Sequence, residues 1–495
     1  MTTRPLVNRA HWAAAVVALA MLGLYCWEIR VWILDDALIS FRYAENLAAG
    51  HGPVYNVGER VEGYTTFLWV TLLALCNRLG LDTVASARWL GMVFAAASLI
   101  ALAGLRRFVP AAAQRGGGAA ALLLGSCATF TSFGYSGMEV TLTGFLVLLT
   151  VLFHLRLESD PRPRWVTVSG VCCALATMAR PENALVFLCL LGWHLVVRPA
   201  GRHAWLRFAV SYSALYGPYF LWRWIYYGWF LPNTFYAKVG GTWDQVVRGF
   251  GYFTDWTGAS LLILAPLIAG LFAHRAIVER YGRVGVVPLV ILVHATYVVA
   301  VGGDGLGAFR FFSPMMPVVC LYSAICLVAL VPQRRRVVAF CALAIAFNVW
   351  QMLHHPRFRE RALGDKTAIH GEITGRWLRD NLDPDMVIAT NTAGSIPYYS
   401  GLKAIDMLGL NDAHIAHTAI DDMGSGRAGH EKSDGDYVLS RKPDYILFDS
   451  AMGSRKPRHT SDRDLWDNPR FREEYSFHTF QLTRTRRLRI YIRNP

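Results

Sequence analysis

Two adjacent carboxylates, Asp35 and Asp36, follow the first long apolar stretch of the chain and open a polar segment. Arg42 lies shortly after them, and Glu62 and Tyr64 come later in the same segment. A carboxylate can take a proton from a hydroxyl group or bind a metal ion. An arginine can hold a phosphate through a bidentate contact. Placed where the chain leaves a membrane, this combination suits chemistry on a charged lipid substrate.

Further polar side chains occur in later loops, which the predicted membrane topology places on the same side of the bilayer. They are Glu139, Arg180, Glu182, Asn233, Tyr236, Lys238, Asp304 and Arg310. Ionisable groups at a membrane boundary are costly, so a cluster on one side indicates function. We predict that Arg42, Arg180, Lys238 and Arg310 hold a lipid phosphate. We assign the other side chains, together with Glu62 and Tyr64, to substrate binding.

Each of these residues also has a purely structural interpretation. Asp is a favourable N-cap, so the aspartate pair can simply begin the helix that follows. Arg180 and Glu182 can form an ion pair across a tight turn, and Glu139 can stabilise a helix N-terminus through the helix dipole. The interfacial alternatives are snorkelling anchors at Lys238 and Arg310 and an aromatic belt at 226–236. The placement of all these polar groups on one side favours function.

The composition is that of a membrane protein. Hydrophobic residues make up 54% of the 495 residues, whereas charged residues make up only 17%, and the mean hydropathy is positive. Apolar runs about long enough to cross a bilayer recur from Ala13 to Trp350. The net charge of +14 is concentrated in short loops, so we expect no nucleic-acid partner. The first run has no small-residue cleavage site, so we interpret it as a retained helix rather than a signal peptide.

We predict about eleven spans that form a polytopic helix bundle of mainly α structure. They cover residues 11–31, 84–105, 117–134, 138–155, 165–179, 182–197, 205–226, 257–274, 284–301, 314–331 and 337–353. Every second connection is rich in arginine, and the positive-inside rule places these connections in the cytoplasm. They contain Arg4, Arg9, Arg106, Arg107, Arg115, Arg156, Arg162, Arg164, Arg198, Arg202, Arg207, Arg275, Arg280, Arg283, Arg334, Arg335 and Arg336. The N-terminus is then cytoplasmic and the C-terminal region extracytoplasmic.

One apolar run, 64–81, does not fit this alternation as a span, because it would move Arg106 and Arg107 to the outer side. We therefore predict a re-entrant or surface-lying helix within the first outer loop, 32–83. Short apolar runs of this kind are often interfacial.

The region 354–495 is polar, and we predict that it forms a separate extracytoplasmic α/β domain after a membrane domain at 1–353. The pattern favours a helix at 372–382 and strands at 386–390, 445–448 and 488–492. All 9 cysteines precede this region, in or beside apolar segments, and their odd number excludes complete pairing. We interpret them as small buried hydrophobic residues rather than disulfides or metal ligands. The spacing of His414, His417 and His430 is not that of a metal site.

Two stretches of the sequence carry a family resemblance. The first comprises Asp35-Asp36, Phe41-Arg42-Tyr43-Ala44-Glu45-Asn46 and Gly58-Glu59-Arg60-Val61-Glu62-Gly63-Tyr64-Thr65, and the second comprises 391–401 and 406–412. The chain resembles the GT-C superfamily of polyprenyl-phosphate-sugar-dependent glycosyltransferases. Within it, the chain is most similar to the bacterial terminal arabinofuranosyltransferases of the mycobacterial cell wall and their relatives. The chain is shorter than the mycobacterial enzymes, which leaves an arabinan acceptor open.

The resemblance implies an enzyme of the bacterial cytoplasmic (inner) membrane. Its donor would be a polyprenyl-phosphate-linked sugar, and its acceptor a cell-envelope glycan or lipid at the outer face of the bilayer. The family's first-loop acid, the base, corresponds to Asp35 or Asp36, with the first acid preferred. A single displacement would invert the anomeric centre. The resemblance leaves the cofactor open between none and a divalent cation, Mg²⁺ or Mn²⁺.

Two other functions share parts of this pattern. A protein O-glycosyltransferase would keep the fold and change the acceptor to a protein hydroxyl group. A transporter or flippase of lipid-linked sugars would need acids and bases within its spans. The predicted spans are mostly free of charge at their centres, which favours the glycosyltransferase.

The alternating arginine loops generate a prediction about topology. A membrane-impermeant thiol reagent added from outside should reach engineered cysteines near Gly240 and Ser450. It should not reach cysteines near Arg162 or Arg335. Labelling near Arg335 in an intact membrane would contradict the predicted membrane topology.

Overall fold

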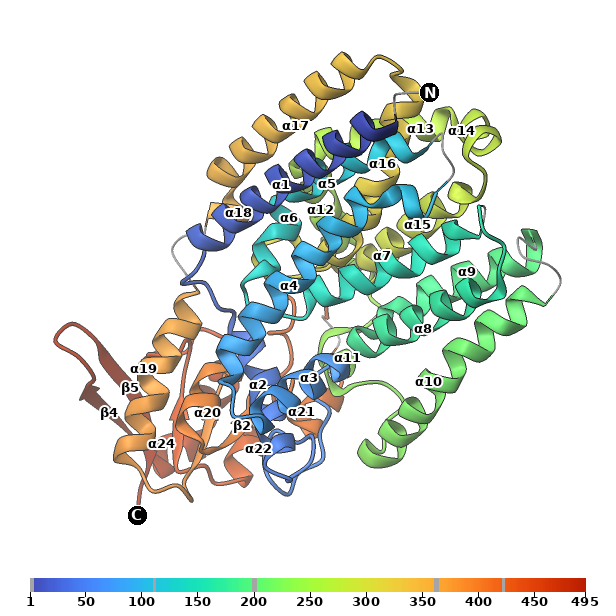
Figure 1. Ribbon diagram of the computed structural model, residues 1–495. Coiled ribbons are helices and arrows are strands. Elements are labelled where there is room, and N and C mark those ends of the chain that lie inside the picture. Colours follow the sequence, from blue (N-terminus) through green and yellow to red (C-terminus); the bar gives the residue numbers. More distant parts are fainter. Residues whose placement is uncertain (1–3, 110–112, 158, 198–202, 360–364, 421–422) are drawn as a thin grey trace. The chain divides into compact units, whose positions relative to one another are not determined.

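The computed structural model describes residues 4–109, 113–157, 159–197, 203–359, 365–420 and 423–495 (Figure 1). Arg198 and Arg202, which belong to a predicted cytoplasmic loop, lie outside the described residues. Contacts divide the chain into two units, each built from three segments. The helical unit comprises Met1–Val31, Arg88–Leu221 and Gly249–Ala362, and the α/β unit comprises Trp32–Ala87, Trp222–Arg248 and Leu363–Pro495.

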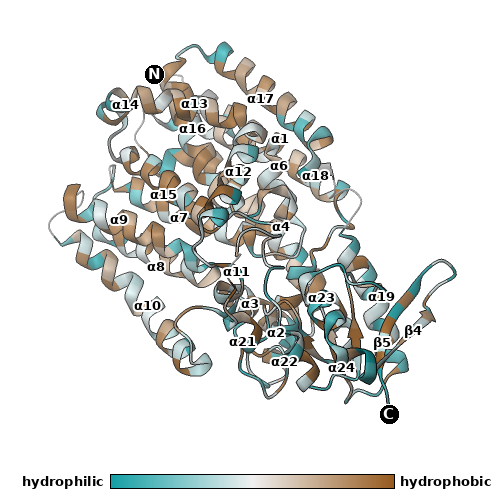
Figure 2. Cartoon of the chain, turned by 180° about the vertical axis from the view of Figure 1, so that it is seen from behind, coloured by the Kyte–Doolittle hydropathy of each residue, from teal (hydrophilic) through white to brown (hydrophobic). Residues whose placement is uncertain are grey.

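The helical unit consists of apolar helices, along which hydrophobic colouring predominates in Figure 2. Its main helices are α1 (Arg4–Glu28), α4 (Thr83–Ala103), α5 (Gly117–Ser126), α6 (Ala128–Thr131), α7 (Val140–Arg156), α8 (Pro163–Ala179), α9 (Ala184–Val197), α10 (Ala204–Tyr227), α12 (Trp243–Ala259), α13 (Leu261–Phe272), α14 (His274–Tyr281), α15 (Val287–Ala300), α16 (Met316–Leu330), α17 (Arg334–His354) and α18 (Pro356–Arg359). Both α4 and α12 begin in the α/β unit, and α10 ends there. Helix α16 is buried on all sides from Met316 to Leu327, so it forms the centre of the helical unit.

Each predicted span overlaps one or more of these helices, which confirms a mainly α membrane protein. Among the described residues, four helices are long and apolar enough to cross a bilayer: Arg9–Glu28, Thr83–Ala103, Gly307–Leu330 and Arg334–His354. Two further helix pairs are bent by 61° and 99°, and the number is six if each bent pair is one span. The total of about eleven spans stays a prediction. The run at 64–81 forms α3 (Phe67–Arg78), and its 12 residues are too few to cross the hydrocarbon core.

The α/β unit contains a five-stranded sheet in the order β2-β1-β3-β5-β4. Its strands are β1 (Val387–Thr390), β2 (Lys403–Asp406), β3 (Tyr445–Leu447), β4 (Tyr475–Gln481) and β5 (Arg487–Arg493). β1 lies parallel to β2 and β3, with Ile388 opposite both Ala404 and Tyr445, whereas β5 is antiparallel to β3 and β4. The predicted strands at 386–390, 445–448 and 488–492 are confirmed as β1, β3 and β5.

The helices of the α/β unit are α2 (Asp35–Ala48), α3, α11 (Asn233–Lys238), α19 (Lys366–Asn381), α20 (Ser395–Ser400), α21 (Ala413–His417), α22 (Gly435–Ser440), α23 (Thr460–Asp467) and α24 (Pro469–Glu474). The predicted helix at 372–382 is the second part of α19, which begins at the N-cap Asp365. Helix α20 ends at Gly401, whose φ of 73° is left-handed and suits glycine. The hydrophobic core contains Ala389, Ile405, Ile446, Phe448, Leu465 and Tyr491.

The first outer loop packs against the edge of this sheet. The buried Asn56 side chain donates to the carbonyl of Ala404 (2.9 Å) and accepts from its N–H (3.1 Å), as a neighbouring strand would. The Tyr55 hydroxyl donates to the carbonyl of Ala393 (2.6 Å). These contacts explain why segment 32–87 groups with the C-terminal region, whereas the predicted boundary near residue 354 stays a prediction.

The Asn56 contacts generate a prediction about stability. Asn56→Ala should destabilise the α/β unit by roughly 1–3 kcal/mol, because the N–H and carbonyl of Ala404 would lose their partner while buried. The melting temperature in detergent should fall accordingly. The control is Asn381→Ala on the exposed end of α19. Equal melting temperatures for both variants would show that the loop does not cover the sheet edge.

Candidate active site

Asp35 begins α2, and its carboxylate contacts a different helix. Its Oδ1 accepts from the Ser395 backbone N–H (2.7 Å) and from the Ser395 hydroxyl (2.5 Å). Its Oδ2 accepts from the Gly394 N–H (3.0 Å). The carboxylate therefore satisfies N–H groups at the start of α20. The N-cap of α2 itself is Leu34, so the simple capping interpretation does not hold for either aspartate within its own helix.

Within the part of the chain that the structure describes, Oδ2 keeps one acceptor position, because a carboxylate oxygen has two lone pairs and the Gly394 N–H is the single donor to this atom. Burial raises the pKa of Asp35 to about 7, although the Ser395 hydrogen bonds act in the opposite direction, and the nearby Asp365 and Asp36 raise it further. A base works best when its pKa is close to the working pH. The geometry thus favours Asp35 as a proton acceptor.

Asp36 is partly exposed and lies beside Asp35 in the first turn of α2. Its charge contributes to raising the pKa of Asp35 and of Asp365. Asp36 therefore affects the site electrostatically through its neighbours, in addition to its predicted role as the alternative base.

Gly394 makes the close approach of Asp35 feasible. A Cβ atom at this position would lie 1.9 Å from the Asp35 carbonyl oxygen and 2.8 Å from Oδ2. Any larger residue would push the carboxylate away from α20. The second resemblance segment, 391–401, thus meets the first-loop motif at this contact.

Arg42 uses its guanidinium group within the α/β unit. It donates to the carbonyls of Tyr55 (2.7 Å), Leu402 (2.8 Å) and Pro397. It also donates to Asn56 Oδ1 (3.2 Å). These contacts hold the first loop against α20 and the start of β2. A phosphate group would have to compete with them for Arg42. The predicted phosphate role of Arg42 stays a prediction.

Glu62 forms a buried pair with Arg223, a residue that the sequence did not single out. Arg223 Nε lies 3.0 Å from both carboxylate oxygens of Glu62, and Arg223 also donates to the carbonyl of Phe230 (2.7 Å). The sequence signal was an arginine near the end of the apolar run predicted as span 205–226, which also contains Arg207 near its start. The Tyr64 hydroxyl, in the same loop as Glu62, pairs with that of Tyr227 at 3.1 Å.

The loop 228–238 is held to the turn after β2. The Asn233 side chain donates to the carbonyls of Gly409 (2.8 Å) and Leu410 (3.0 Å). The Tyr236 ring packs on His417 with a centroid distance of 4.3 Å. The Lys238 side chain lies near Gly429. These contacts place the three predicted residues in the α/β unit, with both aspartates.

The remaining predicted residues gather in the helical unit. Arg180 pairs with Glu139 (3.0 Å) and Glu182 (2.7 Å), and Arg310 pairs with Asp304 (2.7 Å). The ring of Phe311 lies near both guanidinium groups, 5.4 Å from that of Arg180 and 5.3 Å from that of Arg310. The predicted ion pair of Arg180 with Glu182 is confirmed. Three carboxylates therefore offset the positive charge of the two arginines.

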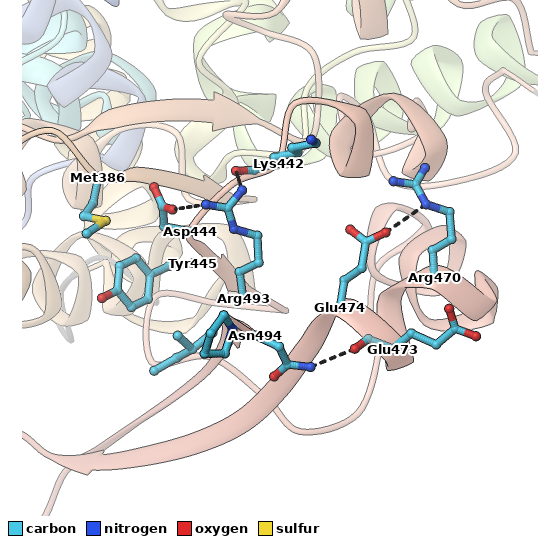
Figure 3. A pocket seen from close by; sticks show the side chains of 11 residues that line it. Met386, Lys442, Asp444, Tyr445, Arg470, Glu473, Glu474, Arg493 and Asn494 are labelled. Carbon is cyan, nitrogen blue, oxygen red and sulfur yellow. Dashed lines mark hydrogen bonds and ion pairs between the residues drawn. The ribbon is translucent and has the colours of Figure 1, made fainter.

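Neither a metal cluster nor the polar groove beside the α/β sheet involves the predicted site residues within the described parts of the chain. Among the described residues, no group of three or more His, Cys, Asp and Glu side chains is arranged to hold a metal ion. A polar groove of about 740 Å³ lies at the amino ends of β1 and β3, with Asp444, Arg493, Arg470 and Glu474 on its walls (Figure 3). Its acids and bases pair with one another, as in Arg493 with Asp444 (2.9 Å), and none of the predicted site residues lines it.

The raised pKa of Asp35 generates a pH prediction. The folded protein holds this proton up to a pH of about 7, whereas an ordinary carboxyl loses it near 3.8. The free energy of unfolding should therefore fall as the pH rises between these values. Asp35→Asn removes this pH-dependent contribution to the free energy of unfolding. The melting temperature of the variant minus that of the parent should therefore increase as the pH rises across that range. Parallel melting profiles would contradict the raised pKa.

Comparisons with known proteins show what this chain is similar to. A family model described as "Domain of unknown function (DUF8728)" matches residues 361–491. The terminal beta-(1->2)-arabinofuranosyltransferase of Corynebacterium glutamicum is 29% identical over 376 residues, which are 68% of this chain and 54% of the relative. The protein with the same description from Mycobacterium tuberculosis is 27% identical over 348 residues, 63% of this chain and 55% of the relative. The chain thus spans about half the length of these curated relatives.

A solved structure extends the likeness to almost the whole chain. ArnT from Cupriavidus metallidurans in the apo state has a TM-score of 0.57 and 14% identity, covering 96% of this chain and 97% of ArnT. ArnT bound to undecaprenyl phosphate has a TM-score of 0.52, covering 82% and 86% of the two chains. The chain is therefore a membrane protein with the GT-C fold, as its sequence motifs predicted.

Proposed function

We propose that this protein is a glycosyltransferase that moves a sugar, arabinofuranose, from a polyprenyl-phosphate donor to a cell-envelope glycan or lipid. The reaction would take place at the extracytoplasmic face of the cytoplasmic membrane. The observation that carries the proposal is the Asp35 carboxylate, which is held by α20 with a pKa of about 7. The names of the two curated relatives support the sugar.

In the proposed reaction, Asp35 takes the proton of the acceptor hydroxyl group. The acceptor oxygen attacks the anomeric carbon and forms the new glycosidic bond. The bond between that carbon and the phosphate oxygen breaks, and polyprenyl phosphate leaves with the electron pair. The open position on Oδ2 is the site for the transferred proton. A single displacement of this kind inverts the anomeric centre.

An apolar cavity of about 530 Å³ in the helical unit supports a lipid-linked donor. It is lined by side chains of α12, α13, α15 and α16, including Trp256, Leu267, Leu271, Leu289 and Leu292. Leu264, Leu267 and Leu271 are spaced along one face of α13, so the cavity follows the helix as a hydrocarbon chain would. The undecaprenyl phosphate bound to ArnT supports the same class of donor.

Arg180 is the arginine best suited to the donor phosphate. It donates through Nε and Nη1 to its two carboxylates, which leaves the two N–H groups of Nη2 for a third partner. His294 connects this region to the apolar cavity, because it lines the cavity and its Nε2 lies 2.8 Å from the carbonyl of Phe311. We also propose that a divalent cation, Mg²⁺ or Mn²⁺, would stabilise the negative charge of the leaving phosphate.

The test is sugar transfer by the purified protein in liposomes that contain a polyprenyl-phosphate arabinofuranose donor and an arabinan oligosaccharide. Asp35→Asn should lower the rate by about 10² or more, because Asn cannot accept the proton. Asp36→Asn should have a smaller effect, and the exposed Asp380→Asn on α19 is the matched control. Mass spectrometry of the glycan and release of polyprenyl phosphate measure the reaction, with and without EDTA.

Three results would change the proposal in different ways. Near-normal transfer by both Asp35→Asn and Asp36→Asn would remove the proposed base. Transfer from the same lipid with another sugar would correct the sugar alone. Loss of activity in EDTA, restored by Mg²⁺ or Mn²⁺, would establish the cation, and full activity in EDTA would exclude that need.

A further inference from the structure

We propose that Ser395 and Asp365 are positioning residues that tune the proton affinity of Asp35 in opposite directions. This inference rests on the proposed role of Asp35 as base. It concerns two residues outside the first outer loop, both of which contact Asp35 within the α/β unit.

Ser395 stabilises the charged form of Asp35. Its hydroxyl and its backbone N–H both donate to Oδ1, at 2.5 and 2.7 Å. The side chain is fully buried, and it is confined by α19, because a Cβ atom at Gly371 would lie 1.8 Å from the Ser395 hydroxyl oxygen. The Ser395 hydroxyl also lies 3.3 Å from the carbonyl of Thr367 on α19. The serine is thus fixed between α19 and the carboxylate.

Asp365 has the opposite electrostatic effect. Its Oδ2 accepts from the backbone N–H of Asp35 (3.1 Å), so a second carboxylate lies against the residue that carries the base. Its Oδ1 accepts from the N–H of Thr367 (2.8 Å) as the N-cap of α19. The like charge of Asp365 disfavours ionisation of Asp35. The same side chain therefore fixes the start of α2, caps α19 and opposes the charge on the base.

Two other titratable groups face Asp35. Asp36, on the same helix, adds a second like charge. Tyr55 comes from the first loop, and its hydroxyl donates to the carbonyl of Ala393 at 2.6 Å. Burial raises the pKa of the Tyr55 phenol well above its ordinary value, so Tyr55 stays neutral at working pH. The charges that act on Asp35 within this group are thus those of Asp36 and Asp365.

The two substitutions should have opposite signs. Ser395→Ala removes a donor to the carboxylate, so the pKa of Asp35 should rise. Asp365→Asn removes a negative charge while keeping an oxygen for the N-cap, so the pKa should fall. A variant that merely loosened the fold would not separate the two directions.

The first experiment measures kcat/KM for sugar transfer against pH. The acidic limb of this pH profile reports the pKa of the base. It should move to higher pH in Ser395→Ala and to lower pH in Asp365→Asn, each by roughly one pH unit. Ser433→Ala and Asp380→Asn, whose side chains pair with Asp464 and Arg379, are the matched controls and should leave the limb in place. Shifts in the same direction, or no shift in Asp365→Asn, would overturn the inference.

The second experiment does not need sugar transfer. The melting temperature is measured from pH 4 to pH 9. The readout is the decrease of the melting temperature with rising pH that the raised pKa of Asp35 causes. That fall should extend to higher pH in Ser395→Ala and end at lower pH in Asp365→Asn. In an Asp35→Asn background, Ser395→Ala should not change the profile in this range, and a persistent change would overturn the inference. Burial also raises the pKa of Asp365 itself, so the effect of Asp365→Asn through Asp35 is the difference between its effects in the parent and in the Asp35→Asn background. A difference of zero would likewise overturn the inference. Absence of transfer with these shifts present would instead reject the proposed function alone.

Discussion

The contact between the Asp35 carboxylate and the start of α20 is the interaction on which the α/β unit depends. It joins residues that are 360 positions apart in the chain. A partly buried carboxylate loses water, and it stays acceptable in the fold only when N–H and O–H donors replace that water. Gly394 and Ser395 supply those donors. The same burial raises the pKa of the Asp35 carboxyl to about 7. A single arrangement therefore joins two segments of the chain and gives the base a suitable pKa.

Around this contact, the first outer loop is held by groups that copy the hydrogen bonding of a strand. Asn56 pairs with both backbone groups of Ala404, and Arg42 donates to the carbonyl of Pro397 within α20 and to that of Leu402 just before β2. An exposed sheet edge invites pairing with other chains, and coverage by side chains removes that hazard without a further strand. The loop is therefore positioned by the sheet rather than by regular structure of its own.

The sequence predicted what depends on local pattern. The apolar runs gave the helices, and branched residues between turns gave β1, β3 and β5. β2 was missed because its four residues include a lysine and an aspartate, and β4 because most of its seven residues are polar, with Ser476, His478 and Thr479 exposed. The first-loop acids could be found from their type and place. Ser395, Asp365 and Arg223 could not, because their roles come from contacts between distant segments. Arg42 illustrates the converse, since a residue type suited to phosphate instead binds backbone carbonyls.

The long sequence separation within the α/β unit has a consequence for biosynthesis. Chains generally fold from the N-terminus as they are made, yet the donors to the Asp35 carboxylate, the acceptor of the Tyr55 hydroxyl and the strand residue paired with Asn56 all lie beyond residue 390. The first outer loop must therefore wait, without its sheet, until nearly the whole chain has been translated and the C-terminal region has joined it. Its charged and polar residues keep it hydrated during that interval. The carboxylate acquires its special environment only at the last step of assembly, so unfinished chains carry an ordinary aspartate there and are chemically silent.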